Sequence, residues 1–210
     1  MTNDWSLDAR ALVRPARTFQ ALADEPLTPG ARTSFWVAVR RPLFLAFVLG
    51  CVISLLTASV ATMRLVGATA IYWSFVPLVE IVALAIVVWR WRGSRTFTSL
   101  IDAFFVGHAA WTLFLLLAGA VLAVTPPQHW WFIITRLAVA GLVVVAGWSA
   151  YVDVCFFRFM CGATLRGAIA RAAVYRVIAW MLIFWIFAVP APTPLGVIQE
   201  VVEAVAEVQR

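Results

Sequence analysis

Charged side chains are scarce in this sequence, and lysine is missing altogether. Only 12% of the 210 residues are Asp, Glu, Lys or Arg, whereas 64% are hydrophobic and the mean hydropathy is +0.95. A soluble domain has about 25% charged and about 45–50% apolar residues, so this chain has too few polar side chains to cover a surface that faces water. The composition excludes an ordinary soluble domain and predicts a protein surrounded by lipid.

Recognised catalytic and metal-binding motifs are also missing. The sequence has no G-x-S-x-G, P-loop or H-E-x-x-H motif. Cys51, Cys155 and Cys161 lie within or beside apolar runs, without C-x-x-C spacing or a nearby histidine, which favours packing over a metal or disulfide role. We therefore expect no enzyme activity, cofactor or metal. The net charge of +6 comes without a nucleic-acid-binding motif, so we expect no nucleic-acid partner.

Long apolar runs make up most of the chain. The hydrocarbon core of a bilayer is about 30 Å thick, and a helix of about 20 residues crosses it. Runs that are apolar on every side indicate helices surrounded by lipid. The fold is therefore predicted to be all-α, a polytopic bundle of about five transmembrane helices. These lie at residues 42–63, 68–89, 99–124, 130–157 and 172–191.

The arginines are distributed unevenly between the predicted loops. Six precede the first span, three lie between the second and third spans, and four lie between the fourth and fifth. The opposite side carries only Arg64 and Arg210, while Arg136 falls within the fourth span. Because arginine-rich loops stay in the cytoplasm, we predict a cytoplasmic N-terminus and, with five spans, a C-terminus outside.

Amphipathic segments flank the predicted bundle, which divides the chain into residues 1–41, 42–194 and 195–210. In the first segment, Pro15 is suited to a first helical turn, and a short helix is expected over residues 16–23. This helix either lies on an anionic membrane face or is tucked under the bundle. The last segment is expected to form a short acidic amphipathic helix that packs on the bundle or on a partner outside the cytoplasm.

Ionisable residues inside the spans are the candidate functional residues, because a charge at the bilayer centre costs about 2.5–3.5 kcal/mol on insertion scales. Glu80 lies deepest, near the middle of the second span and three residues after Pro77. It is either a proton or cation site or a structural carboxyl group, neutral or paired with Arg136. Both interpretations make Glu80 and Arg136 members of a candidate intramembrane polar site.

Three further residues complete this candidate site. Asp102 and Asp153 lie near the cytoplasmic ends of the third and fourth spans, at the depth of Arg95 and Arg158, which favours interfacial ion pairs or contact with water. His108 lies about two turns above Asp102. A histidine without a second ligand at i+4 is more typical of a hydrogen-bonded packing residue than of a metal ligand.

Three stretches together resemble the bacterial form of the Ypt-interacting protein (YIP) domain family. The first, RPARTFQALADEP at residues 14–26, is similar to the segment that precedes the family's first span. The second, GSRTFTSLIDAFFVGHAAW at residues 93–111, is similar to the glycine- and phenylalanine-bearing lead into the third span. The third, which includes FRFMCG at residues 157–162 within the stretch 148–175, resembles the loop that joins the last two spans.

This resemblance implies a non-enzymatic, multi-pass protein of the bacterial cytoplasmic (inner) membrane. Its expected role is membrane organisation or scaffolding through helix–helix and protein–protein contacts, with membrane lipid, other membrane proteins or a second copy as partners. Eukaryotic relatives are associated with vesicle trafficking and small GTPases. The alternative is a small transporter or channel, or an accessory subunit of a membrane complex, with a polar path around Glu80 and Arg136. Convergence of Glu80, His108 and Arg136 on a water-accessible cavity would favour this alternative.

Overall fold

The computed structural model describes residues 4–25, 35–89 and 95–188, and within these ranges all regular structure is helical. This confirms the predicted all-α class. The predicted C-terminal helix at residues 195–210 lies outside the described residues. The elements in chain order are α1 (Asp4–Val13), α2 (Pro15–Asp24), α3 (Phe35–Ala58), α4 (Met63–Trp73), α5 (Phe75–Val88), α6 (Phe97–Val106), α7 (Ala109–Val124), the 3₁₀ turn η1 (Pro127–His129), α8 (Trp130–Ala140), the π-helical turn η2 (Gly141–Val145), α9 (Ala146–Phe159) and α10 (Leu165–Ala188).

Four stretches of the described chain are helical, long and apolar enough to cross a membrane, and a bent pair of helices makes a fifth candidate. The four are Phe35–Ala58, Met63–Val88, Trp130–Phe159 and Leu165–Ile186. The fifth consists of α6 and α7, whose axes meet at 46°. This count agrees with the prediction of about five spans and supports a membrane protein. The first span begins at Phe35, ahead of the predicted start, and Pro42 lies inside it.

The second span is broken at Ser74, between α4 and α5. Pro77 has no backbone N–H to donate to the carbonyl of Trp73, and proline is accommodated better in the first turn of a helix than in its interior. The chain therefore starts a new helix, with Pro77 in the first turn of α5. The Ser74 hydroxyl closes the preceding helix by donating a 2.6 Å hydrogen bond to the carbonyl of Ile71.

The third span bends at Gly107 and His108, between α6 and α7. The Gly107 N–H donates back to the carbonyl of Phe104 at 2.9 Å, and His108 is the N-cap of α7. A Cβ atom at Gly107 would lie 2.9 Å from Cγ1 of Val152 on α9, which is closer than such atoms pack. Glycine therefore allows the bend to approach α9, and the bend places His108 inside the protein.

The core lies where α2, α3, α5, α6, α9 and α10 meet, and aromatic rings fill much of it. Phe104 of α6 packs edge-on against Phe156 of α9 and Tyr175 of α10, with ring centroids 5.2 and 5.0 Å apart. Phe19 of α2 is fully buried and reaches Phe156 at 5.8 Å. Of the two predicted placements for the first amphipathic segment, α2 thus takes the one packed against the bundle, and Pro15 begins it as expected.

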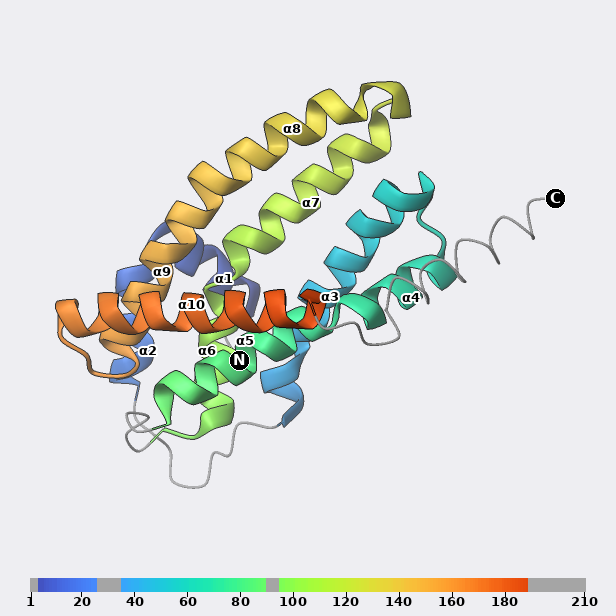
Figure 1. Cartoon of the computed structure of the whole chain (residues 1–210). Coiled ribbons are helices and arrows are strands. Elements are labelled where there is room, and N and C mark those ends of the chain that lie inside the picture. The colour runs from blue at the N-terminus through green and yellow to red at the C-terminus, as the bar shows by residue number, and fades with distance from the viewer. Residues whose placement is uncertain (1–3, 26–34, 90–94, 189–210) are drawn as a thin grey trace.

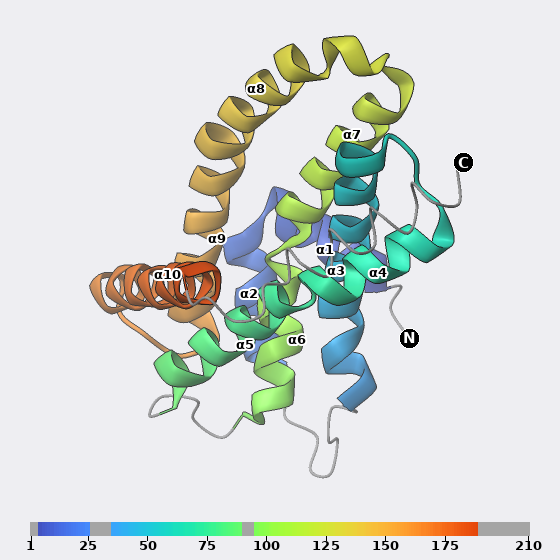
Figure 2. The same ribbon diagram turned by 45° about the vertical axis from the view of Figure 1, so that its right-hand side comes forward.

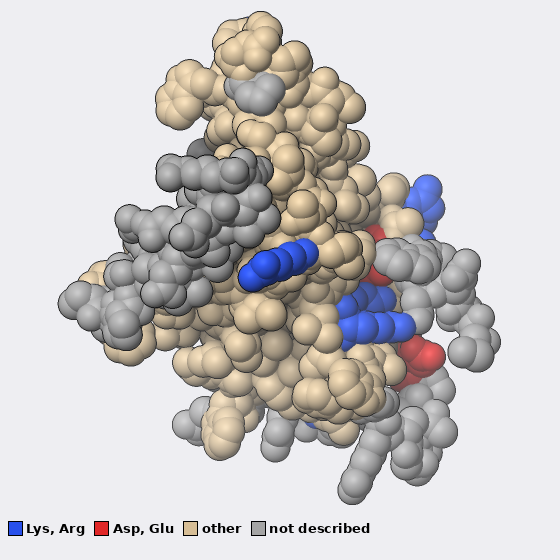
Figure 3. Space-filling model, turned by 90° about the vertical axis from the view of Figure 1, so that its right-hand side faces the viewer, with Lys and Arg blue, Asp and Glu red and all other residues tan. Residues whose placement is uncertain are grey.

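The helices pack against one another around this core (Figure 1). α3 packs along α4 and α7, while α10 packs against α9 and α5. Both ribbon views show α7 and α8 as a hairpin that extends away from α2 and α10 (Figures 1 and 2). The face in Figure 3 is built mainly of uncharged residues; apart from one blue side chain near its middle, the visible charged side chains gather toward one edge.

Candidate functional site

The deepest of the predicted ionisable residues, Glu80, is paired with His108. Glu80 lies on α5, and its Oε2 atom is 3.1 Å from Nε2 of His108 at the bend of the third span. The exposed fractions of the two side chains are 18% and 9%. The His108 ring stacks on Phe105 with centroids 4.8 Å apart, and its Nδ1 atom faces the carbonyl of Phe104 at 3.4 Å. A packed, paired histidine agrees with the sequence-based interpretation of His108.

This pairing has a simple chemical consequence. A carboxylate beside a protonated imidazole has no net charge as a pair. Burial of a neutral pair in a low-dielectric interior costs less than burial of an isolated charge. The pair can therefore lie inside the bundle without exposing a net charge to lipid.

A second buried pair connects α9 to α10. Nε of Arg176 donates to Oδ2 of Asp153 at 2.8 Å, and Nη2 of Arg176 donates to the Ser149 hydroxyl at 2.7 Å. The expected partner, Arg158, lies instead beside its neighbour Phe159, with Cζ 5.3 Å from the ring centroid. Positions five apart on a helix point in different directions. The side chain of Asp153 therefore faces α10, while Arg158 is exposed.

Tyr175 interacts with both buried pairs. It is buried on α10 and interacts electrostatically with both Glu80 and Asp153, and His108 interacts with Asp153 as well. The two pairs thus share one buried environment. Sequence reasoning identified neither Tyr175 nor Arg176 as a site residue. Arg176 was counted among the arginines of the loop between the fourth and fifth spans. Arg176 lies inside the predicted span 172–191, and this position could have identified it as a buried cation.

A third charged cluster joins α1, α3 and α6 around Arg41. Nε of Arg41 donates to Oδ1 of Asp8 at 3.0 Å, and Nη1 of Arg41 donates to Oδ1 of Asp102. Nη2 of the neighbouring Arg40 is 3.9 Å from the same Asp102 oxygen. Burial raises the pKa of Asp8 above its usual value, and the attraction of Arg41 offsets only part of this effect.

The predicted proximity of Asp102 and Arg95 is replaced by a different arrangement. Arg95 donates two hydrogen bonds, of 3.1 and 2.7 Å, to the carbonyls of Leu22 and Ala23 at the end of α2. The last carbonyls of a helix lack partners within it and carry partial negative charge, so they attract a cation. Asp102, one turn into α6, faces the start of α3 and its arginines instead.

Arg136 does not approach Glu80. Its Cζ atom lies 3.9 Å from the ring centroid of Phe132 on the same helix, and its side chain is exposed. α8 packs against α7 and the adjoining turns, and both ribbon views place it away from α5 (Figures 1 and 2). Of the alternatives left open for Glu80, the pairing with Arg136 is not the one found, because the α7–α8 hairpin carries Arg136 away from the bend that holds His108.

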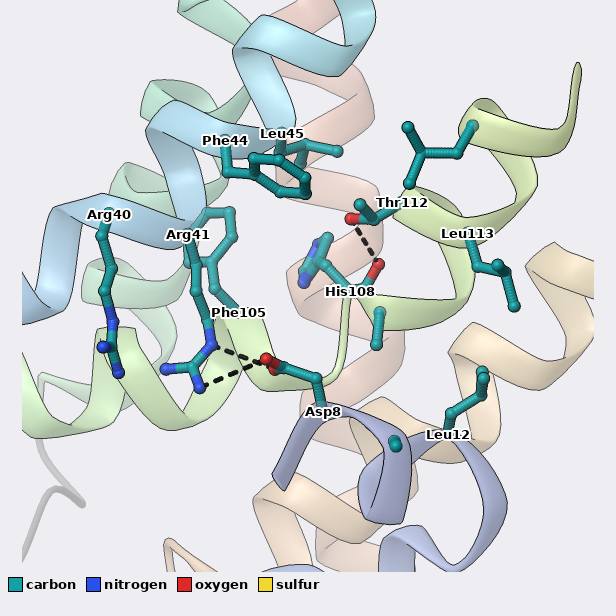
Figure 4. Close-up of a pocket in the computed structure, with 13 residues that line it drawn as sticks. Asp8, Leu12, Arg40, Arg41, Phe44, Leu45, Phe105, His108, Thr112 and Leu113 are labelled. Carbon is teal, nitrogen blue, oxygen red and sulfur yellow. Dashed lines mark hydrogen bonds and ion pairs between the residues drawn. The ribbon is translucent and has the colours of Figure 1, made fainter. Parts of the chain in front are cut away.

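A pocket of about 510 Å³ lies beside the Glu80–His108 pair, between α1, α3 and the bent third span. Figure 4 shows Arg40, Arg41 and Asp8 together on one side of this pocket and Leu113 on the other. His108 lines it between these two sides, and the Thr112 hydroxyl donates to the His108 carbonyl at 3.1 Å. The remaining lining residues are Ala9, Leu12, Phe44, Leu45, Phe105, Ala109 and Leu116.

Metal ligands do not gather anywhere in the described part of the chain. No group of three or more His, Cys, Asp or Glu side chains is placed there to hold a metal ion. Cys51, Cys155 and Cys161 are free thiols. Cys161 lies between α9 and α10, and burial raises its pKa to about 11 although Arg171 and Arg95 act in the opposite direction.

Comparison with known proteins adds no family to these observations. No family model matches the chain, and no curated protein or solved structure matches it. The function proposed below therefore depends on the residues and contacts of this chain.

Proposed function

We propose that this chain is a non-catalytic integral membrane protein of YIP-like type that organises or scaffolds membrane components through helix contacts. The observation that carries the proposal is the pairing of the intramembrane acids. Glu80, Asp102 and Asp153 each contact a basic side chain from a different helix of the same chain. Charges used in this way connect helices to one another.

The connected helices surround the core. The pairs tie α5 to the start of α7, α6 to α3, and α9 to α10. Removal of one partner from a buried pair costs more than the pair itself contributes, because the other charge is left uncompensated. The pairs therefore hold the helices in a defined arrangement, as a protein that presents fixed surfaces to partners requires.

Partner surfaces are available on the outward faces of the spans. Trp180, Phe184 and Trp185 of α10 and Trp131 and Phe132 of α8 are largely exposed. Helices associate in membranes through packing and interhelical hydrogen bonds rather than through exclusion of water. Large aromatic side chains on these two helices offer extensive packing contacts to lipid and to a neighbouring protein helix.

A small transporter or accessory subunit is the second candidate. It is favoured by the pocket beside the Glu80–His108 pair and by the interruption of two spans, at Ser74 and at Gly107. Interrupted helices near mid-membrane often mark substrate and ion sites in transporters. Because Arg136 lies elsewhere, any polar path would be formed by Glu80 and His108 with the Asp8–Arg41–Asp102 cluster.

A flux measurement separates the two candidates. The purified full-length chain is reconstituted into vesicles that contain a trapped pH-sensitive dye, and proton flux is followed after a pH jump. The scaffold proposal predicts flux equal to that of protein-free vesicles, for the native chain and for Glu80→Gln. Glu25→Gln, at the exposed end of α2, is the matched control. Flux that is present in the native chain and the control but abolished by Glu80→Gln would establish the transporter instead.

A second measurement tests the scaffold directly. A photo-crosslinking amino acid is placed in native membranes at Trp185, which is exposed on α10, and at buried Ala179 of the same helix as the control. Discrete adducts of constant mass from position 185, and none from position 179, are expected. Crosslinks to lipid alone from position 185 would count against a partner on this face.

A further inference from the structure

The pocket beside His108 has a polar end and an apolar end, arranged along two membrane-spanning helices. The polar end is formed by Asp8, Arg40 and Arg41. The apolar end is formed by Leu113 and Leu116, which lie up to about eight residues, or roughly 12 Å, along α7 from His108. α3 and α7 pack against each other, so the pocket follows their length from the arginines toward the interior of the span.

The apolar end opens toward the surroundings of the spans. Phe44 on α3 and Leu113 and Leu116 on α7 line the pocket, yet 37%, 43% and 47% of these side chains remain exposed. The helices that carry them are candidate spans, so in a bilayer these exposed side chains would face hydrocarbon. A ligand can therefore enter the pocket sideways from the lipid without passing through water.

The polar end lies where a lipid headgroup would lie. Arg40 and Arg41 begin the strongly apolar part of α3, and the arginine distribution predicts that this end is cytoplasmic. Arg41 is held by Asp8 and Asp102 and forms a fixed wall. The neighbouring Arg40 side chain lies 3.9 Å from Asp102 and is 40% exposed. A guanidinium group offers planar donors that match a phosphate.

From this polarity and this opening we propose that the pocket binds one phospholipid of the cytoplasmic leaflet. One acyl chain lies between α3 and α7 against Phe44, Leu113 and Leu116, and the phosphate lies beside Arg40. The volume of about 510 Å³ is within the range of roughly 300–1,000 Å³ typical of small-molecule sites. The site requires neither a scaffold nor a transport role, so its test is independent of the proposed function.

Photolabelling of the full-length chain tests the site. The chain is placed in nanodiscs of phosphatidylcholine that contain a small fraction of phosphatidylglycerol with a diazirine in one acyl chain, and labelled peptides are identified after irradiation. Labelling is expected to be several-fold stronger on residues 105–116 than on the exposed face of α10, which contacts lipid without a pocket. Equal labelling of the two regions would overturn the proposal.

Paired substitutions locate the acyl chain and the phosphate. Ala109→Trp fills the pocket and is expected to remove most of the labelling, whereas Ala120→Trp, at an exposed position of the same helix, leaves it unchanged. Arg40→Gln is expected to lower it roughly two- to five-fold, the effect of one exposed ionic contact, while Arg158→Gln at another exposed position leaves it unchanged.

The outcomes are distinct. Labelling that survives Ala109→Trp would overturn the acyl-chain position. A diazirine fatty acid that labels the pocket as strongly as the phospholipid, with no effect of Arg40→Gln, would overturn the phosphate contact. Melting temperatures measured alongside identify a variant that does not fold, and Arg40→Gln, at an exposed position, keeps the proposal testable if Ala109→Trp is such a variant.

Discussion

Helices α3 and α4 cross closely at Gly50, and substitution of this glycine by alanine should destabilise the protein. Gly50 is buried on α3. A Cβ atom there would lie 2.8 Å from Cβ and N of Ala70 and 2.8 Å from the carbonyl oxygen of Val66. Both neighbours are on α4, and two of the three atoms belong to its backbone, so no side chain can rotate away. The two helices would have to move apart.

The size of the effect follows from three contributions. Restoring an ordinary carbon–carbon contact requires a shift of roughly 1 Å, and overpacking of this kind costs about 1–3 kcal/mol. The same shift weakens the 2.9 Å hydrogen bond from the Thr69 hydroxyl to the Gly50 carbonyl; such interhelical bonds contribute about 0.6 kcal/mol. The higher helix propensity of alanine returns about 0.5–1 kcal/mol. Gly50→Ala is therefore expected to cost about 1–3 kcal/mol.

Thermal unfolding in mild detergent, followed by the fluorescence of the 11 tryptophans, measures this cost. A decrease in Tm of roughly 2–12 °C is expected from the scaling for chains of this size. Gly67→Ala on α4 is the matched control, because a Cβ atom there meets nothing within 4 Å. It should leave the Tm unchanged or raise it slightly. If Gly50→Ala were as stable as Gly67→Ala, the close approach of α3 and α4 would be refuted.

Two other predictions follow from the charged and thiol groups. Asp153→Asn and Arg176→Gln should each lower the free energy of SDS-induced unfolding by up to about 3–5 kcal/mol, because each leaves a charged partner uncompensated. The double variant should recover part of this loss. Costs that simply add in the double variant would contradict the pairing. Only the thiolate of Cys161 reacts with iodoacetamide, and a pKa of about 11 leaves little thiolate at pH 8. The alkylation rate at pH 8 should therefore be roughly 100-fold lower than for an unperturbed cysteine, and it should rise about tenfold for each unit of increase in pH. Peptide mass spectrometry measures this rate, and reaction as fast as in SDS-unfolded protein would contradict the burial of this thiol.

The extent of the helices could be read from hydropathy because lipid solvation acts on each segment independently. A run of about 20 apolar residues favours the membrane whatever its neighbours are. The approximate positions of the spans were predicted on this local basis. The short helix expected over residues 16–23 was predicted from a different local signal, the suitability of Pro15 for a first helical turn, and α2 covers that range. The break at Ser74 was also within reach, since Pro77 leaves the carbonyl of Trp73 without its helical donor.

The partners of the charged residues could not be predicted, because each partner comes from a distant part of the chain. Asp102 is paired with Arg41, 61 positions away, and Asp153 with Arg176, 23 positions away. Depth along a span placed Arg95 near Asp102 and Arg158 near Asp153, but similar depth does not decide which helix faces which. For the same reason, the sequence could not show that Arg136 lies away from Glu80 and His108.

Composition and the order of apolar runs thus determined that the chain is helical and suited to lipid, because these properties depend only on the transfer of local segments from water. Which ionisable groups meet, where the pocket opens, and which face of each span stays exposed were decided by the tertiary structure. These features require the bend at Gly107 and the close packing of α3 with α4 and of α9 with α10. Contacts between helices depend on their relative rotation, which no single segment encodes.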